Sequence, residues 1–537
     1  QYLPADTVAY VSIRTDQAYI ETINDVISTL AAAAGESVPE GGLLGFLNEQ
    51  IARESDGQFN YETAVRAWLG NSAALAVVDA QQLMASDSPL LLIEVADAQP
   101  LRDLLAQLFA SSDQYTVEEG DGFTYYINRS RFSESLLLTD EVLYVSHAPV
   151  IDNLFANRGA ESLATSPRFI AAYDALPAEG YNLFGYLNSA ALVAAMSSFV
   201  DAEDLPFPID FDALQAAINV QSFGGTLLDD RTFALDLALV HGDALITDAL
   251  GLPALPDFTL APVNLDFASV APVDSFAFTA GTSGGTSALL AFDYLELLAP
   301  ALADLAQAAD PQVALNFRAG LPTIINVVRG FFTDVFGVPF ADLMAMLDGQ
   351  NASFMRVSNE TGSFDFAQVY ENLRPDLNAN VLSGAESLLT RFAVPFESAD
   401  GRINIDLAAM TEMLEDLNRG RRSPDMAMFG ILFGAGMDRI SFALSPEYLL
   451  SGTPEAVGFV LGGSRIARLN STPAFQHEAQ FFLPGANQVW YLATAPLVEA
   501  FPSTEMQGAA AFESFGISTA PGDGASLMRL TMTLKAE

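Results

Sequence analysis

The chain contains no cysteine, a single lysine (Lys535) and only three histidines among its 537 residues. Without cysteine it forms no disulfide, offers no thiolate nucleophile and builds no cysteine-based metal site. It also lacks an uninterrupted apolar run of the roughly 18 residues that a membrane-spanning helix needs. The most apolar stretch, which starts at Ser287, carries Asp293, Glu296 and Asp304 and therefore predicts an amphipathic helix.

Basic residues are scarce beside the acidic ones. The 23 lysines and arginines face 67 aspartates and glutamates, which gives a formal net charge of −44. A surface of this sign repels nucleic-acid phosphates and anionic headgroups, so the composition excludes nucleic-acid binding. The 50% hydrophobic content argues against a disordered chain. Because one hydrophobic core stops growing at about 250–300 residues, the length predicts two domains.

Several segments of the first half return in the second half. LPADTVAY at Leu3–Tyr10 resembles APVDSFAF at Ala271–Phe278, and LYVSHAP at Leu143–Pro149 resembles YLLSGTP at Tyr448–Pro454. The segment that starts at Ser162 likewise aligns with the segment that starts at Arg468. We therefore predict two homologous tandem domains, at residues 1–250 and 265–537.

Both halves mix short strands with amphipathic helices. VAYVSIR at Val8–Arg14 and FAFTAG at Phe276–Gly281 each predict an opening strand, and each is followed by residues with helical spacing. Hairpin-like material follows in the middle of each half. This order predicts the α+β class, with a largely antiparallel sheet packed with helices in each domain.

Two segments are predicted to lie outside regular structure: the junction between the halves and an insertion in the second half. Residues 251–264, GLPALPDFTLAPVN, contain three prolines and predict a semi-rigid linker. The second half is longer, and the arginine-rich segment Leu417–Gly430 predicts an exposed insertion.

The quoted repeats also resemble a bacterial family. LPADTVAYVSIR, WLGNSAALAVV and SPRFIAAYDALP are similar to members of DUF3352, a domain family of unknown function, over most of the chain. The resemblance implies a secreted or envelope-associated protein and supplies no catalytic residues. The chain begins at Gln1 and enters a strand almost at once, which predicts a mature N-terminus after removal of a signal or anchor.

One segment matches a catalytic motif. Gly281–Gly285 fits the G-x-S-x-G pattern of a nucleophile elbow, with Ser283 as the nucleophile. The aligned segment of the first half has no serine there, and a hydrolase of this type needs a parallel sheet. A glycine- and serine-rich turn is the favoured interpretation.

The remaining polar residues are scattered. His147, His241 and His477 lack the spacing of a metal-binding pair. Acidic groups occur at Glu118-Glu119, at Asp229-Asp230 and at Asp201, Glu203 and Asp204, where chance pairs are expected in so acidic a chain. We predict no catalytic, cofactor-binding or assigned metal residues; Ca²⁺ at acidic loops and glycans at four sequons stay open, the sequons being Asn128, Asn351, Asn359 and Asn470.

The sequence favours a protein that is not an enzyme. A duplicated body without a catalytic constellation suits a secreted cell-surface protein that self-associates as a structural or assembly subunit of a layer or filament. The alternative is an envelope protein that binds an apolar ligand, which the high apolar content favours.

Overall fold

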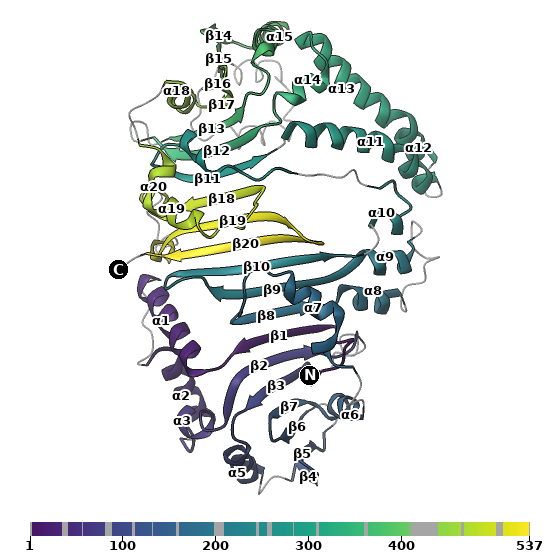
Figure 1. Cartoon of the computed structure of the whole chain (residues 1–537), viewed down its shortest axis with the longest axis vertical. Coiled ribbons are helices and arrows are strands. Elements are labelled where there is room, and N and C mark those ends of the chain that lie inside the picture. Colours follow the sequence, from purple (N-terminus) through teal and green to yellow (C-terminus); the bar gives the residue numbers. More distant parts are fainter. Residues whose placement is uncertain are drawn as a thin grey trace, which may run out of the picture. The chain divides into compact units, whose positions relative to one another are not determined.

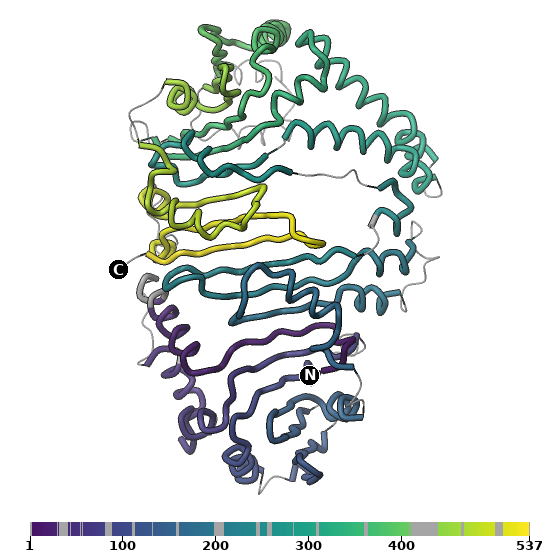
Figure 2. The backbone as a smooth tube through the Cα atoms, in the orientation of Figure 1, coloured from purple at the N-terminus to yellow at the C-terminus, as the bar shows by residue number. Residues whose placement is uncertain are grey.

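Two compact units make up the chain in its computed structural model. The first comprises residues 1–250 with 507–511 and 522–528, and the second comprises 251–506, 512–521 and 529–537. Figure 1 labels the elements, and Figure 2 traces the backbone from purple to yellow along the sequence. The structure describes residues 3–34, 41–55, 57–80, 88–109, 113–130, 133–156, 161–197, 209–242, 246–254, 260–282, 284–307, 311–358, 363–407, 409, 439–462, 467–500 and 508–535.

The first unit is built on an antiparallel sheet. The strand order is β4-β5-β6-β7-β3-β2-β1-β8-β9-β10. The strands are β1 Ala9–Arg14, β2 Leu69–Val77, β3 Leu90–Val95, β4 Tyr115–Gly120, β5 Phe123–Asn128, β6 Glu134–Thr139, β7 Val142–His147, β8 Leu183–Leu187, β9 Ile218–Leu227 and β10 Thr232–His241. The helices are α1 Gln17–Ala34, α2 Gly42–Glu54, α3 Tyr61–Ala64, α5 Ala98–Phe109, α6 Ala148–Ala156, η1 Leu163–Thr165, α7 Pro167–Asp174, α8 Ser189–Ser197, α9 Phe211–Ala217, α10 Ile246–Ala249 and η8 Gly508–Ala511.

The second unit repeats this strand order. Its sheet runs β14-β15-β16-β17-β13-β12-β11-β18-β19-β20. The strands are β11 Ser275–Thr282, β12 Gln350–Val357, β13 Phe364–Glu371, β14 Phe396–Ala399, β15 Arg402–Asp406, β16 Arg439–Leu444, β17 Tyr448–Gly452, β18 Gln488–Ala493, β19 Phe512–Gly522 and β20 Ala525–Leu534. The helices are η3 Leu265–Val270, α11 Gly284–Gln307, α12 Pro311–Leu315, η4 Asn316–Gly320, α13 Leu321–Phe336, α14 Phe340–Ala345, η5 Pro375–Leu377, α15 Asn378–Arg391, α18 Pro454–Gly462, η6 Leu469–Ser471, α19 Pro473–Ala479 and α20 Thr494–Ala500.

Helices beside large antiparallel sheets confirm the predicted α+β class. Local chemistry explains several boundaries. Pro149 and Pro454 lie in the first turns of α6 and α18, where a missing backbone N–H costs no hydrogen bond. Gly122, with φ of 79°, makes the tight turn between β4 and β5 that the Gly-Asp-Gly sequence predicts. The arginine-rich insertion at Leu417–Gly430 lies outside the described residues.

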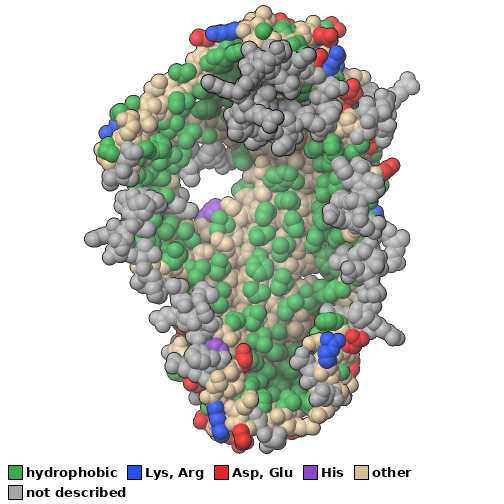
Figure 3. All heavy atoms as spheres, turned by 180° about the vertical axis from the view of Figure 1, so that it is seen from behind, with side chains coloured by type: hydrophobic (Ala, Val, Ile, Leu, Met, Phe, Trp, Pro, Cys, Tyr) green, Lys and Arg blue, Asp and Glu red, His purple; other side chains and the backbone are tan. Residues whose placement is uncertain are grey.

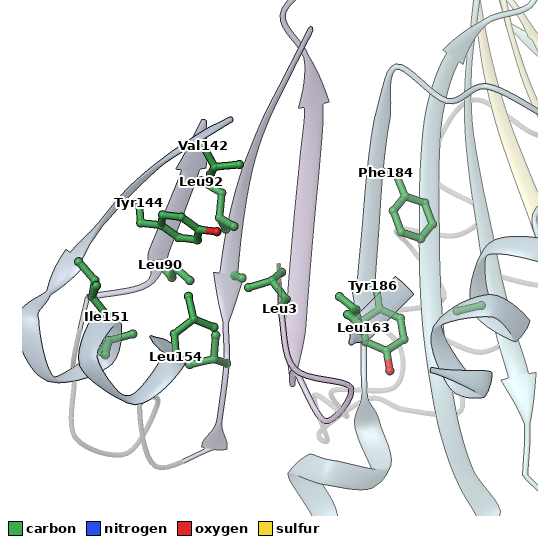
Figure 4. Packing of buried hydrophobic residues seen from close by; sticks show 14 of the residues in the cluster. Leu3, Leu90, Leu92, Val142, Tyr144, Ile151, Leu154, Leu163, Phe184 and Tyr186 are labelled. Carbon is green, nitrogen blue, oxygen red and sulfur yellow. The ribbon is translucent and has the colours of Figure 1, made fainter. Parts of the chain in front are cut away.

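Alternate residues of the first sheet enter two different cores. Leu92 and Tyr144 point to the face covered by α6 and α7, where Ile151 of α6 packs against them. Their neighbours point to the other face, where Leu143 packs with Leu101 of α5. Figure 4 shows part of the first core, with Leu92 and Tyr144 on the sheet side and Ile151 on the helix. The alternation follows from the two-residue period of a strand.

Aromatic rings occupy matching places in the two units. Tyr10 on β1 meets Phe169 of α7 edge to face, with ring centroids 5.9 Å apart. Phe278 on β11 meets Phe475 of α19 in the same way, at 5.7 Å. Edge-to-face pairs stabilise the fold by more than their buried area alone gives, so these rings strengthen the packing of each helix against its sheet. Among the described helices, none combines the length and apolarity needed to cross a bilayer.

The hydroxyl of Tyr186 on β8 is buried without a hydrogen-bond partner among the described groups. We expect Tyr186→Phe to raise the free energy of unfolding by about 1 kcal/mol, because the change removes an unsatisfied buried polar group and keeps the ring. Tyr181→Phe is the matched control. Its hydroxyl donates to Asp236 at 2.7 Å and accepts from the Ala178 amide, so this change should destabilise. Urea titrations of both variants decide the sign.

The same burial makes stability sensitive to alkali. It raises the pKa of Tyr186 to about 12, from 10.0 in an unfolded chain. A raised phenol pKa favours the folded state fully below pH 10, and this contribution is lost as pH rises towards 12. Wild-type protein should therefore lose stability more steeply than Tyr186→Phe between these pH values. The free energy of unfolding is measured by urea titration at several pH values. An equal fall with pH in both proteins would contradict the raised pKa of Tyr186.

Candidate functional site

The nucleophile-elbow motif lies between a strand and a helix, as the pattern requires. Gly281 and Thr282 are the last two residues of β11 and Gly284 begins α11, whereas Ser283 itself lies outside the described residues. The strand pairings described for the second unit are antiparallel, so the parallel sheet of such hydrolases is not found among them.

The three histidines lie on separate elements. His147 ends β7, is buried, and has its Nε2 3.2 Å from Ser88 Oγ. His241 ends β10 with its Nε2 2.9 Å from Ser526 Oγ, and His477 on α19 contacts the ring of Phe481. The structure brings none of these three side chains together.

The acidic pairs have structural surroundings. Glu118 and Glu119 are neighbours on the exposed strand β4, so their side chains point to opposite faces. Asp229 accepts from the amides of Arg231 and Thr232 and shapes the turn into β10. Asp201, Glu203 and Asp204 lie outside the described residues. Among residues with described positions, no three or more histidines or acids gather as metal ligands would.

Three of the four sequons can be placed. Asn128 ends β5, Asn351 lies in β12 and Asn470 lies in η6, and all three side chains are half-buried. Asn359 is outside the described residues. Glycosylation at these positions stays a prediction.

The strongest candidate site is one face of the first sheet, called the apolar face below. Register places the odd-numbered residues of β1 beside those of β2 and β8, so that Val11 lies between Leu75 and Gly185. Rows continue through β9 to β10, where Phe223 pairs with Leu237. The apolar face comprises Ala9, Val11, Ile13, Asn71, Ala73, Leu75, Val77, Leu183, Gly185, Leu187, Gln221, Phe223, Gly225, Leu227, Phe233, Leu235, Leu237 and Leu239.

No member of this described set is charged, and large side chains stand in solvent. Leu75 is 48% exposed, Leu239 46%, and Ile13 44%. In Figure 3, seen from behind, hydrophobic side chains occupy the middle of the lower part of the view, over the strands of the first unit. Gly185 leaves space that the ring of Phe223 covers, because a Cβ there would stand 2.0 Å from that ring. The face is therefore nearly continuous apolar surface.

The matching face of the second unit is also uncharged along its central strands, but more polar. Thr279 on β11 takes the place of Val11 and bonds Ser353 on β12, Oγ1 to Oγ, at 2.8 Å. Trp490 on β18 pairs with Thr279 on the other side. The first unit is thus the one whose sheet exposes aliphatic side chains in rows.

A second candidate is a polar cluster in the second unit, in which three hydroxyl groups surround one buried acid. Glu478 on α19 is 0% exposed, and Ser514 donates to its Oε2 at 2.6 Å and Thr533 at 3.0 Å. Thr531 donates to Oε1. Gly516 makes room, since a Cβ there would lie 2.3 Å from Oε1. Full burial removes this carboxylate from any external substrate, so the cluster is structural.

The sequence contains one signal for this cluster. The aligned repeats place Glu478 opposite Ala172, which is also fully buried. An acid at the position of a buried alanine indicates a buried carboxylate that hydroxyl groups must satisfy. Nothing comparable signals the apolar face, because it depends on which strands pair and which helices cover them.

In comparisons with known proteins, no family model, no curated protein and no solved structure matches the chain.

We expect Glu478→Ala to lower the free energy of unfolding by about 3 kcal/mol, because three buried hydroxyls lose their acceptor and a cavity opens. Gly516→Ala should also destabilise, through the clash with the Glu478 carboxylate. In the double variant the clash with the carboxylate is relieved, while the close contacts of the new Cβ with Thr531 and Phe482 remain. The combined loss of stability should therefore be smaller than the sum of the two single losses. Denaturant titration of the four proteins measures this coupling, and strict additivity would count against the contact.

Proposed function

We propose that the chain is a non-enzymatic, secreted protein that self-associates at the cell surface as a structural or assembly subunit. The apolar face of the first unit carries this proposal, with a second copy of the chain as its occupant. We also infer that the two units arose by duplication, which the shared strand order and the repeated segments support. The resemblance to DUF3352 supports a location in the envelope or outside the cell.

Charge is the argument for a second copy. At −44, two copies that approach through acidic surface repel each other. The apolar face brings no carboxylates together, and every apolar Å² that it removes from water contributes about 25 cal/mol. Two such sheets can stack at about 10 Å with side chains interdigitated, as in a β-sandwich. Exposed apolar patches of this kind mark interaction surfaces on soluble proteins.

Ile13→Glu tests the interface. The variant places a carboxylate on the apolar face at a position that is 44% exposed, so folding should be little affected. Loss of one buried aliphatic side chain and burial of a charge should weaken association at least about tenfold. Sedimentation velocity over a concentration series measures the dissociation constant. Added salt should strengthen wild-type association, since it screens the repulsion between acidic copies.

Ile170→Glu is the matched control. Ile170 lies on α7, which covers the opposite face of the sheet, and it is also 44% exposed. This variant should associate as the wild type does. A monodisperse monomer at high concentration, with and without Ca²⁺, would overturn the proposal. A lipid that co-purifies with the wild type and is lost in Ile13→Glu would instead favour the apolar-ligand protein.

A further inference from the structure

The second sheet has a face of neutral polar side chains on the strands β13, β12, β11 and β18, which Figure 1 shows side by side in that order. Phe278 packs against Phe475 of α19, so its neighbour Thr279 points to the opposite side of the sheet. Register places further side chains beside Thr279. We call this set the polar face: Thr279, Gly281, Asn351, Ser353, Gln368, Tyr370, Gln488 and Trp490.

The polar face corresponds position by position to the apolar face of the first unit. The aligned repeats place Thr279 where the first unit has Val11. Strand register then equates Val11 with Thr279, Leu75 with Ser353, Ala73 with Asn351, Leu183 with Gln488, and Gly185 with Trp490. Each aliphatic side chain is therefore replaced by a hydroxyl or an amide, and a glycine is replaced by an indole.

These replacements introduce polarity without charge. The chain has 67 acidic residues, so carboxylates are its main means of keeping a surface soluble. No residue of the polar face is acidic or basic. Solubility alone does not explain that choice, whereas a ligand that is itself neutral and rich in hydrogen-bonding groups does.

The polar face keeps hydrogen-bonding capacity towards solvent. Thr279 Oγ1 and Ser353 Oγ lie 2.8 Å apart, and a bonded pair of hydroxyls retains one O–H that can donate. Gln368 is exposed, and its Nε2 donates to the Tyr370 hydroxyl. Its Oε1 can therefore accept from a ligand. Donors and acceptors thus alternate along one row of the sheet.

An indole stands in the same row. The chain has two tryptophans. Trp68 is buried and donates its Nε1–H to the Ala64 carbonyl, whereas Trp490 is half-buried and pairs with Thr279 across the strands. The negative face of an indole attracts C–H bonds that carry partial positive charge, as those of a sugar ring do.

A shallow gap lies one row further along. A Cβ at Gly281 would stand 3.4 Å from Asn351 Oδ1 and 3.4 Å from Gln488 Cγ. Glycine therefore leaves space between two amide side chains, each of which can both donate and accept.

We propose that the polar face binds a neutral, extended polysaccharide. A chain of pyranose rings presents hydroxyl groups along its edges and C–H bonds on its faces, which match the amides, hydroxyls and indole of a flat sheet. An apolar lipid would leave these polar groups without partners, and an acidic polymer would be repelled by the charge of −44. The site lies in the second unit and is separate from the proposed self-association surface.

Titration of the full chain with cellohexaose and with the hexamer of β-1,4-linked N-acetylglucosamine tests the proposal. At least one of these neutral chains should bind saturably and change the tryptophan emission. Trp490→Ala should weaken binding at least about tenfold, because an aromatic platform carries much of such an affinity. A hexamer of galacturonic acid should bind more weakly than the neutral chains, because its carboxylates meet an acidic protein.

Ser353→Leu locates the site, because it restores the residue of the first unit at the centre of the polar face. This variant should bind at least about tenfold more weakly. Leu75→Ser makes the converse change at the equivalent position of the first unit and is the matched control, in which binding should be unchanged. Urea titration establishes that both variants and Trp490→Ala are folded, and isothermal titration calorimetry gives the dissociation constants.

Four results would overturn the proposal: no saturable binding of either neutral hexamer, equal binding by Trp490→Ala, equal binding by Ser353→Leu, or loss of binding in Leu75→Ser. Weaker self-association of Trp490→Ala in a protein that binds neither hexamer would show that a second copy covers the polar face instead. Ile13→Glu should bind the hexamers as the wild type does, so the failure of one proposal leaves the other intact.

Discussion

Each unit depends on the two-residue alternation of its antiparallel strands. In the first unit, one set of side chains, which includes Leu92 and Tyr144, is buried under α6 and α7. The alternate set on β1, β2 and β8 to β10 forms the apolar face, of which Leu75 and Leu239 stand exposed. A register slip of one residue would exchange the two sets and expose the core, so burial of one face determines the other.

This arrangement keeps carboxylates apart from the exposed apolar side chains of the first sheet. Carboxylates on β3 and on the strands of the apolar face point away from that face: Glu94 and Asp236 both point to the helix-covered side. Buried acids are matched with hydroxyl donors, as Tyr181 bonds Asp236 and three hydroxyls bond Glu478. A charge of −44 is compatible with compact cores because the buried charges among the described residues are few and hydrogen-bonded.

The two units share one strand order but carry different side chains at equivalent positions. Where the first exposes Val11, the second has Thr279 bonded to Ser353. Side-chain size and polarity, changed at equivalent positions of similar sheets, thereby give each unit its own surface.

Local pattern in the sequence determined much of the secondary structure. The predicted strand Val8–Arg14 matches β1 within one residue, and the predicted strand at Phe276–Gly281 lies within β11. The α+β class followed from such elements, since periodicity depends on neighbouring residues alone. Tertiary structure decided the rest. The exposure of Val11 and the place of Trp490 depend on pairing between strands distant in sequence, such as β1 with β8, and on which face a helix covers. Local residue order carries no direct record of those contacts.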